Sequence, residues 1–462
     1  MHALDLDRET REALWRRVGE LLEGHREGLR GCAIAPEAAA PQDFAVGDPQ
    51  DPLAVVDAAF RALEGGMTHV DHPRYFGLFN PAPAALAVLA DAIASGLNPQ
   101  LATRSHAPWA VDAEAELIRA LGERFGWSRD ETGGTFTSGG GEANVTALLV
   151  ALGEAFPEAR SRGVRALPGE PCVYVSAEGH GTIRRAAHVA GLGTDAVREI
   201  PTDAQLRMKP ERLREAVAKD RADGRLPFFI AATAGTTGSG SIDPIREIAG
   251  IAERAGCWFH VDAAWGGLAA LVPELRSVVD GSAQADSLTF DPHKAMSAPM
   301  GTGALLVRRE GALERTFAIR AGYMPRDGAS DPYARSMQWS RRFLGLRVLM
   351  PLAAAGWEGY AASLRTQVAL ADRLRTGLLA RRWLLVNDTP LPVVCFVDEV
   401  RRGGRFLDAV ARAVLASRGG WLSVPRFSSG ARALRACVNN HRTTAEDIDA
   451  LLDALDRARE AT

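Results

Sequence analysis

Apolar segments without polar alternation recur between residues 172 and 307, and helical patterns separate most of them. The predicted strands are residues 172–176, 228–233, 257–262, 288–290 and 304–307. Helical patterns occupy residues 181–190 and 245–254 between them. Strands that are apolar on both faces are typical of a parallel sheet covered by helices on both sides. The sequence therefore predicts an α/β fold with a mostly parallel sheet.

Polar residues stand at the carboxyl ends of these strands, where open α/β sheets bind their ligands. Ser176, Thr233 and Asp262 end three strands, and Asp-Pro-His-Lys at residues 291–294 follows a fourth. An isolated loop lysine is most often solvated. Burial and nearby cations lower an amine's pKa, however, and a neutral amine attacks a carbonyl. Lys294, placed between two apolar strands, is therefore a candidate Schiff-base lysine.

A glycine-rich loop precedes an apolar helix that is predicted at residues 145–155. Gly139, Gly140 and Gly141 leave backbone N–H groups accessible at the helix N-terminus, where the dipole favours a phosphate. The loop is neither G-x-G-x-x-G nor a Walker motif, which argues against a dinucleotide or a nucleoside triphosphate. A glycine-rich turn before a helix is also a common way to close a fold, so this signal is weak alone.

Together these features match the requirements of pyridoxal 5'-phosphate. This cofactor needs a lysine for its aldehyde, an acidic partner for its pyridine nitrogen, a planar group on the ring face and a phosphate site. Lys294, Asp262, His180 and the glycine loop supply this set. Alone, His180 would more often be structural and Asp262 a helix cap, so the prediction depends on the combination.

Composition argues against several other classes of protein. Of the 462 residues 47% are hydrophobic and 24% charged, with a net charge of -3, which is ordinary for a globular protein and gives no sign of nucleic-acid binding. No apolar run approaches the ~20 residues of a membrane span, and residues 1–8 lack a signal-peptide profile. The five scattered cysteines form no C-x-x-C pair. We therefore expect no disulfide framework, no metal site and a cytoplasmic location.

The pattern divides the chain into three parts. Residues 1–80 are predicted to form a helical arm, residues 81–345 a large cofactor domain and residues 346–462 a smaller α+β domain. The arm has two amphipathic helices, at 5–30 and 53–63, and too few apolar residues for a core. We therefore expect it to pack across a two-fold interface with a second copy of the chain.

The sequence resembles the group II pyridoxal-phosphate-dependent amino-acid decarboxylases, which include aromatic-amino-acid, tyrosine and glutamate decarboxylases. Nearly the whole chain takes part, and the resemblance is carried by residues 72–76, 137–144, 260–267, 291–294 and 434–437. It implies fold type I with a seven-stranded sheet, a homodimer with shared active sites, and decarboxylation of a small-molecule L-amino acid to an amine and carbon dioxide. The substrate's side chain is not implied.

The resemblance also implies roles for individual residues. Lys294 is similar to the Schiff-base lysine, Asp262 to the pyridinium partner and His180 to the imidazole stacked on the ring. Tyr323, in a Gly- and Pro-containing loop, matches the tyrosine that protonates Cα after carbon dioxide leaves. The remaining cofactor-binding residues implied are Gly139, Gly140, Gly141, Thr233, His293 and Ala264. The substrate-binding residues implied are Arg435, Tyr75, Phe79, Arg104 and His106.

Three departures from the family pattern bear on the substrate rather than on the cofactor. Ala295 follows the lysine where many relatives have Trp, Gly141 stands where many have Ser, and Arg104 stands where relatives often have an aromatic residue. The rival functions are a pyridoxal-phosphate-dependent lyase or decarboxylating aldehyde synthase on the same scaffold, and a catalytically silent cofactor-binding protein. Tyr323 favours amine formation, and intact Lys294 and Asp262 argue against a silent protein.

Overall fold

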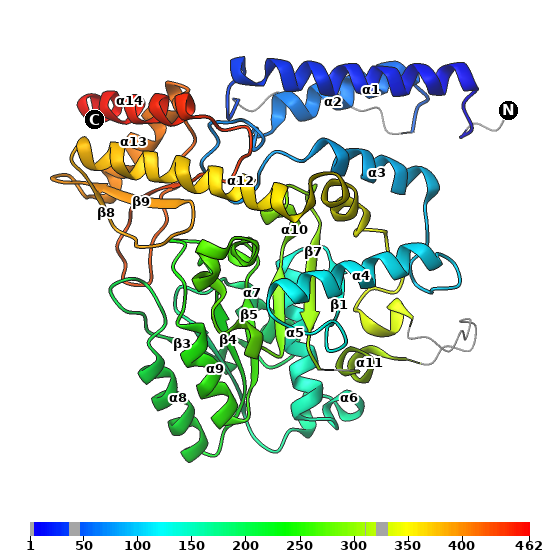
Figure 1. Cartoon of the computed structure of the whole chain (residues 1–462), viewed down its shortest axis with the longest axis vertical. Helices are drawn as coiled ribbons and strands as arrows, with labels where there is room; N and C mark the ends of the chain where they lie inside the picture. Colours follow the sequence, from blue (N-terminus) through cyan, green and yellow to red (C-terminus); the bar gives the residue numbers. More distant parts are fainter. Residues whose placement is uncertain (1–3, 37–46, 310, 320–330) are drawn as a thin grey trace.

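A seven-stranded sheet lies at the centre of the larger part of the molecule (Figure 1). The computed structural model describes residues 4–36, 47–309, 311–319 and 331–462. The strands of the large sheet are β1 (Gly133–Thr137), β2 (Pro171–Ser176), β3 (Val197–Ile200), β4 (Leu226–Thr233), β5 (Trp258–Asp262), β6 (Ser287–Phe290) and β7 (Gly303–Val307). Their order is β1-β7-β6-β5-β4-β2-β3. Strands β2 to β6 are parallel and only β7 runs antiparallel to both its neighbours, which confirms the mostly parallel sheet.

The alternation of side chains along each strand explains why the apolar segments contain few polar residues. On β2, Cys172 and Tyr174 pack into one buried core, while Val173 and Val175 pack into the core on the opposite face of the sheet. Helices cover both faces, so both sets of side chains are removed from water. The helices of this part are α4 (Pro108–Arg124), α5 (Gly140–Ala155), α6 (Ala159–Arg162), α7 (Thr182–Val189), α8 (Pro210–Ala222), α9 (Ile245–Ala255), α10 (Pro292–Ala295) and α11 (Ala312–Phe317).

The C-terminal part contains a second, smaller sheet, as the sequence predicts. It is antiparallel, with the order β10-β9-β8. Its elements are β8 (Trp383–Leu385), β9 (Val393–Asp398), β10 (Leu434–Cys437), α12 (Leu346–Ala380), α13 (Gly404–Ala416) and α14 (Ala445–Ala461). Helix α12 is broken at Gly356, which has φ 64° and ψ 175°. Because glycine adopts this conformation readily, the chain forms two successive helices there.

The N-terminal helices form a layer along the top of the molecule in Figure 1. Helix α1 (Arg8–Gly28) and α2 (Pro52–Gly66) lie side by side, and Arg17 Nε donates to Asp57 between them at 2.7 Å. No residue of either helix is buried. Helix α3 (Ala85–Leu97) follows and packs against α12. In the described part of the chain, no helix has the length and apolar character needed to cross a membrane.

Candidate active site

The carboxyl ends of the parallel strands bring the predicted polar residues to one edge of the sheet. Asp262, at the end of β5, pairs in register with Thr233 on β4 and with Thr289 on β6. Thr233 and Asp262 are buried, at 5% and 7% exposure. Lys294 lies on α10, directly after β6. Parallel packing therefore places residues from three sections of the chain beside one another, as expected for a ligand site in such a sheet.

Asp262 is held in one orientation by two donors. Its Oδ2 accepts from the Asn144 amide at 3.0 Å, and its Oδ1 accepts from the backbone N–H of Ala264 at 3.1 Å. Asn144 reaches it from the second turn of α5 and also donates to Thr182 Oγ1 at 2.8 Å. A carboxylate fixed in this way is suited to hold a proton on a ring nitrogen opposite it.

A buried chain of hydrogen bonds determines which end of the Asn144 amide faces Asp262. Trp258 Nε1, which only donates, bonds to Ser287 Oγ at 2.8 Å, and Ser287 Oγ also lies 2.8 Å from His260 Nδ1. Burial lowers the pKa of His260 to about 4, so its ring is neutral. If Ser287 donates to Nδ1, His260 carries its proton on Nε2, which lies 3.1 Å from Asn144 Oδ1. The amide nitrogen of Asn144 is thereby turned toward Asp262.

Lys294 is paired with a buried carboxylate. Its Nζ lies 2.9 Å from Asp291 Oδ2, and Asp291 is only 1% exposed. The other oxygen, Asp291 Oδ1, is buried without a hydrogen-bond partner. His293 packs beside this pair and its Nδ1 lies 2.8 Å from the carbonyl oxygen of Thr302. Burial lowers the pKa of His293, so the lysine has a neutral histidine as its neighbour.

The glycine loop lies against the same residues. Gly139 has φ +147°, and a Cβ at Gly140 would lie 2.9 Å from Asp291 Oδ2. The first hydrogen bond of α5 runs from Ala143 N–H to the Gly139 carbonyl at 3.1 Å. The three preceding N–H groups are therefore free at the helix N-terminus and can bind a phosphate. A Cβ at Gly141 would meet only Thr182 Cγ2 at 3.6 Å, an ordinary contact, so the loop has space for a Cβ at this position.

His180 connects to this group through Thr182. It is exposed, and its Nδ1 lies 3.0 Å from Thr182 Oγ1, which in turn accepts from Asn144. The imidazole is thus tied to the residue that orients Asp262. An exposed ring attached to a buried polar network is suited to cover one face of a flat ligand.

Arg435 is a buried cation on β10 with incomplete pairing. It is 1% exposed, and NH1 donates to the carbonyl of Gly77 and, at 3.1 Å, to Ser423 Oγ. Its Nε and NH2 have no hydrogen-bond partner. The guanidinium lies 4.7 Å over the Phe79 ring, which stacks on Trp265 at 4.2 Å. Trp265 and Lys294 line the same small cavity, so this chain of contacts leads from Arg435 to the lysine.

Tyr75 lies against Gly77, whose carbonyl accepts from Arg435, whereas Arg104 and His106 make separate contacts in the single chain. Tyr75 is buried, and its ring is tilted against that of Trp421, with ring centroids 5.3 Å apart. Arg104 pairs with Asp112 at 2.7 Å, and its backbone N–H donates to Asp331 at 2.8 Å. Exposed His106 bonds to Thr103 through Nδ1 at 2.6 Å. Their roles, like all the individual site assignments, remain predictions, and Tyr323 lies outside the described residues.

Sequence reasoning did not assign roles to Asn144, Asp291 or Trp265. Each stands in or next to a motif that carries the family resemblance, and Asn144 is the last residue of the glycine-rich motif. For Asn144 the sequence does contain a signal, because a polar residue stands one helical turn after the predicted phosphate loop. Its orientation toward Asp262 depends on the packing of α5 on the sheet, which the local sequence does not specify.

The residues fit pyridoxal 5'-phosphate. An oriented carboxylate, a lysine beside an incompletely paired Asp291, an exposed imidazole and free N–H groups at a helix N-terminus are the donor set that this cofactor requires. These groups are linked by direct contacts through Asn144, Thr182 and Ala264. The bound cofactor would be held by Lys294, Asp262, His180 and the glycine loop.

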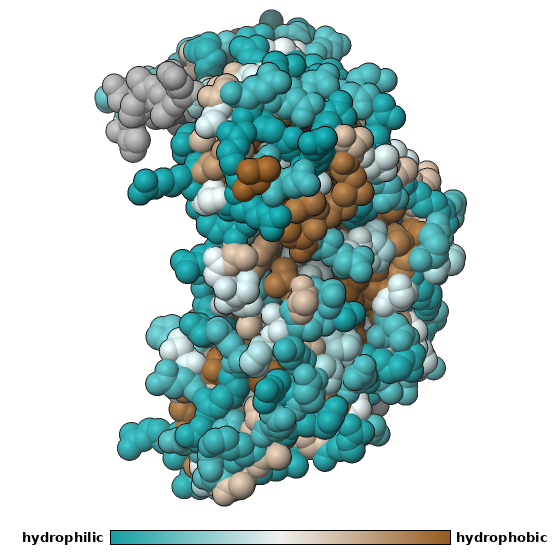
Figure 2. Space-filling model, turned by 90° about the vertical axis from the view of Figure 1, so that its left-hand side faces the viewer, coloured by the Kyte–Doolittle hydropathy of each residue, from teal (hydrophilic) through white to brown (hydrophobic). Residues whose placement is uncertain are grey.

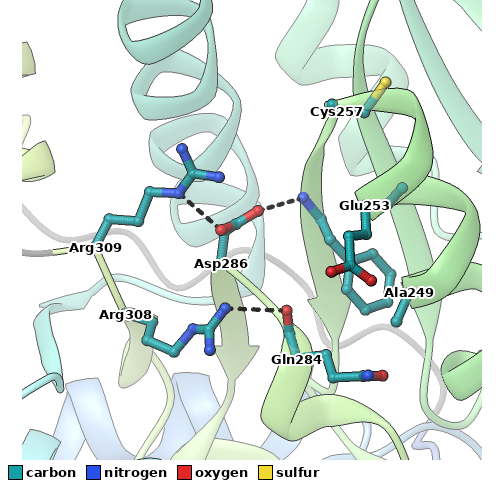
Figure 3. A pocket seen from close by; sticks show the side chains of 10 residues that line it. Ala249, Glu253, Cys257, Gln284, Asp286, Arg308 and Arg309 are labelled. Carbon is teal, nitrogen blue, oxygen red and sulfur yellow. Dashed lines mark hydrogen bonds and ion pairs between the residues drawn. The ribbon is translucent and has the colours of Figure 1, made fainter.

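A separate cavity of about 390 Å³ lies where β5 and β6 begin, at the opposite end of the strands from Lys294. Figure 3 shows Arg309 and Arg308 directed toward groups on the β6 side. Arg309 Nε pairs with Asp286 Oδ1 at 2.8 Å, and Arg308 donates to the carbonyl of Gln284 at 3.4 Å. Both arginines thus pair with groups of the cavity, and burial raises the pKa of Cys257 to about 12, so this thiol is not activated.

The fold and the site define a pyridoxal-phosphate-dependent enzyme of fold type I. A family model described as the pyridoxal-dependent decarboxylase conserved domain matches residues 36–398. The chain belongs to this family and is an amino-acid decarboxylase, a carboxy-lyase that depends on pyridoxal phosphate.

Similar proteins agree with this assignment. Cysteine sulfinic acid decarboxylase of Homo sapiens is 32% identical over 84% of this chain and 82% of its own. L-2,4-diaminobutyrate decarboxylase of Rhizobium meliloti (strain 1021) is 33% identical over 88% of this chain and 82% of its own. The crystal structure of mouse CSAD superposes with a TM-score of 0.91 at 28% identity, covering 98% of this chain and 99% of that one.

Proposed function

We propose that this decarboxylase acts on L-amino acids with a short acidic side chain and releases the amine and carbon dioxide. The observation that carries the proposal is Arg435, a buried guanidinium with two unpaired nitrogens. A buried cation without full pairing is costly, so an anionic group of the ligand, either its α-carboxylate or an acidic side chain, would complete its hydrogen bonds. The name of the human relative points to cysteine sulfinate, an amino acid with a short acidic side chain.

Arg104 is the second feature that supports an acidic substrate. We propose that its loop reaches the active site of a second copy of the chain. In the single chain Arg104 and Asp112 form an exposed pair, with side chains 47% and 55% exposed. Such a pair contributes at most about 1 kcal/mol, so Arg104 can exchange it for an anionic ligand. Phe79 and Trp265 would bound the same space with apolar surface.

In the proposed mechanism the bound cofactor supplies an electron sink for the pair released when the bond from Cα to the carboxyl carbon breaks. Lys294 would bind the cofactor aldehyde, and Asp291, whose Oδ2 lies 2.9 Å from Lys294 Nζ, would hold and position the proton of the lysine amine. Asp262 would hold the proton on the pyridine nitrogen, and His180 would cover one face of the ring. Arg435 orients the substrate through a carboxylate.

Tyr323 would decide the product. We propose that its phenol delivers a proton to Cα after carbon dioxide leaves, which yields the amine. The alternative, a decarboxylating aldehyde synthase, would release an aldehyde instead. This role comes from the resemblance to the group II decarboxylases, in which a tyrosine at this place favours the amine. A phenol has an ordinary pKa of about 10, and a nearby cation lowers this pKa so that it lies closer to neutral pH.

The active assembly would be a homodimer in the cytoplasm. Helix α3 exposes Leu86, Leu89, Ile93 and Leu97 at helical spacing, so they lie along one face. Figure 2 shows that apolar residues also gather in the upper half of the face that it presents. Exposed apolar surface of this kind supports a partner subunit. The free thiols of the cysteines suit a reducing compartment.

A substrate screen tests the proposal. Carbon dioxide and amine are measured together for L-cysteine sulfinate, L-aspartate, L-glutamate, L-2,4-diaminobutyrate and L-tyrosine. We expect the highest kcat/KM with a short acidic substrate and equal yields of the two products. A preference for diaminobutyrate or tyrosine would contradict the acidic substrate class. Aldehyde in place of the amine would contradict the role of Tyr323.

A further inference from the structure

Two histidines and an aspartate from the N-terminal part of the chain converge far from Lys294 in sequence. His25 comes from α1, and His69 and Asp71 come from the turn after α2. One ring nitrogen from each histidine and one carboxylate oxygen of Asp71 lie within 4.8 Å of one another. Within this cluster, His25 Nε2 lies 3.1 Å from Asp71 Oδ2. The donor set is thus nitrogen, nitrogen and oxygen.

The cluster is sheltered and incompletely paired. His69 is only 3% exposed, and its Nδ1 is buried without a hydrogen-bond partner. Asp71 Oδ1 is also buried without a partner, and the side chains of His25 and Asp71 are 12% and 14% exposed. Buried polar atoms are nearly always satisfied in folded proteins, so two unpaired atoms on members of one cluster indicate a missing ligand.

Glu64 completes the arrangement from α2. Its Oε1 lies 3.1 Å from His25 Nδ1, the ring nitrogen opposite the one that faces Asp71. A carboxylate that accepts from the far nitrogen of a histidine fixes the tautomer and raises the basicity of the near nitrogen, as it does for histidines that ligate metals. Arg442 lies 3.6 Å from Asp71 Oδ2. Its single positive charge does not balance the carboxylates of Glu64 and Asp71, so the cluster keeps a net negative charge.

We propose that His25, His69 and Asp71 bind a divalent transition-metal ion, with Zn²⁺ as the best match and Glu64 orienting His25. Imidazole and carboxylate ligands suit Zn²⁺, which takes four ligands in a tetrahedron, so a water would supply the fourth. Tetrahedral bonds of about 2.1 Å put donors about 3.4 Å apart. The most separated donors here must therefore approach by at most about 1.4 Å.

Such an ion would fasten the helical arm to the body of the protein. Asp71 and His72 are already joined to the C-terminal part, because Asn440 Nδ2 donates to both their carbonyls at 3.0 and 3.1 Å. His25 belongs to α1, which has no buried residue of its own. The ion would thus cross-link an otherwise exposed helix to the segment that leads to Tyr75 and Phe79. The expectation of no metal site considered only cysteine spacing and overlooked these histidines.

Metal retention on the cofactor-loaded enzyme tests the site. The protein is treated with a chelator, dialysed against Zn²⁺ and then against metal-free buffer, and bound zinc is measured by mass spectrometry. Thermal unfolding is followed with and without Zn²⁺. The variants are His25→Ala, His69→Ala and Glu64→Gln. The control is His188→Ala, which removes an exposed histidine of α7 outside the cluster.

We expect wild type and His188→Ala to retain one zinc per chain and to unfold at a higher temperature with Zn²⁺ present. His25→Ala and His69→Ala should lose both properties, and Glu64→Gln should bind about 10- to 100-fold more weakly. Should His69→Ala not fold, His25→Ala alone decides the outcome. Wild type that retains no more zinc than His25→Ala, or an unfolding temperature that Zn²⁺ leaves unchanged, would overturn the proposal.

Discussion

At the scale of single residues, Lys294 can be tested directly because the chain contains only three lysines. We expect borohydride reduction of the cofactor-loaded enzyme, followed by peptide mapping, to label Lys294 alone. Lys294→Ala should lose the label and the absorbance of the bound cofactor. Lys219→Ala is the control, because this exposed lysine pairs only with Asp223, at 2.6 Å. A label on Lys209 or Lys219 would rule out the assignment.

Asn144 offers a second test, of a residue that acts through Asp262. Asn144→Ala removes the donor at 3.0 Å and frees Asp262 to turn. Loss of such a supporting partner costs about 10- to 100-fold in affinity or activity. We expect weaker cofactor binding and a changed absorbance spectrum, measured in parallel with turnover. Asp262→Asn should cost more, about 10²-fold or greater in turnover, because it removes the charge itself. Equal effects of the two variants would contradict the indirect role.

His72 makes stability depend on pH. It is 3% exposed, its Nδ1 accepts from the backbone N–H of Arg74 at 2.9 Å, and burial lowers its pKa from 6.5 to about 4. The unfolded chain therefore binds a proton at His72 below pH ~6.5, whereas the folded chain does not. The contribution of His72 to the free energy of unfolding is present above that pH and is lost as the pH falls toward 4. The shift corresponds to up to about 3 kcal/mol.

The variant His72→Asn keeps an acceptor near Arg74 but cannot titrate in this range. We expect its unfolding free energy, measured with denaturant, to fall less than that of wild type between pH 6.5 and 4. His188→Asn, on the exposed side of α7, should behave as wild type. Identical slopes for wild type and His72→Asn would show that His72 does not control this dependence.

At the scale of elements, the glycine that begins α5 is sterically tight, whereas the glycine that precedes α7 is open. A Cβ at Gly140 would lie 2.9 Å from Asp291 Oδ2, whereas a Cβ at Gly181 meets nothing within 4 Å. Overpacking costs ~1–3 kcal/mol, and here it would displace the partner of Lys294. We expect Gly140→Ala to weaken cofactor binding about 10-fold or more and Gly181→Ala to leave it unchanged, as measured by equilibrium dialysis. Equal affinities would contradict the packing argument.

Hydrophobic patterning predicted the elements that are strongly apolar or clearly interrupted. The strands predicted at residues 228–233 and 257–262 agree with the structure. The pattern missed β3, whose middle residues are the polar Arg198 and Glu199, because an edge strand needs apolar residues at only some positions. It did not give the antiparallel direction of β7, since pairing direction depends on long-range contacts rather than on local sequence.

The grouping of the site residues could be predicted from the sequence to about the same extent as the helices and strands. Lys294, Asp262 and Thr233 stand at strand ends, and the parallel sheet alone brings such ends together. The network from Trp258 to Asn144 was not predictable, because its members are far apart in sequence and meet only when α5 packs on the sheet. The contact between Phe79 and Trp265 likewise joins the end of the arm, as predicted at residues 1–80, to the loop after β5.

At the scale of the whole molecule, the N-terminal layer lacks a core of its own. None of the 21 residues of α1 or the 15 residues of α2 is buried. Even the large apolar side chains of Trp15 and Leu63 are exposed, at 62% and 66%. Helix α3 adds Leu89 and Ile93, at 54% and 46% exposure. Helices with unburied apolar faces gain stability mainly from packing, so this layer requires a second surface.

The dimer is tested by placing charges on that surface. We expect wild type to sediment as a dimer and the double variant Leu89→Arg, Ile93→Arg to sediment as a monomer, because burying unpaired guanidinium groups in an interface is costly. Both side chains are exposed in the single chain, so the protomer should keep its helical circular dichroism. Val400→Arg is the control, since Val400 is 84% exposed in the turn after β9.

Activity separates a shared site from a merely structural dimer. If the Arg104 loop of one chain contributes to the site of the other, the monomeric variant should retain the cofactor on Lys294 but lose most turnover of an acidic substrate. Turnover should also appear when an Arg104→Ala chain is mixed with a Lys294→Ala chain, both with an intact α3, because one site of the mixed dimer then contains both residues. A monomeric variant with full turnover, or a wild-type chain that sediments as an active monomer, would refute the shared site.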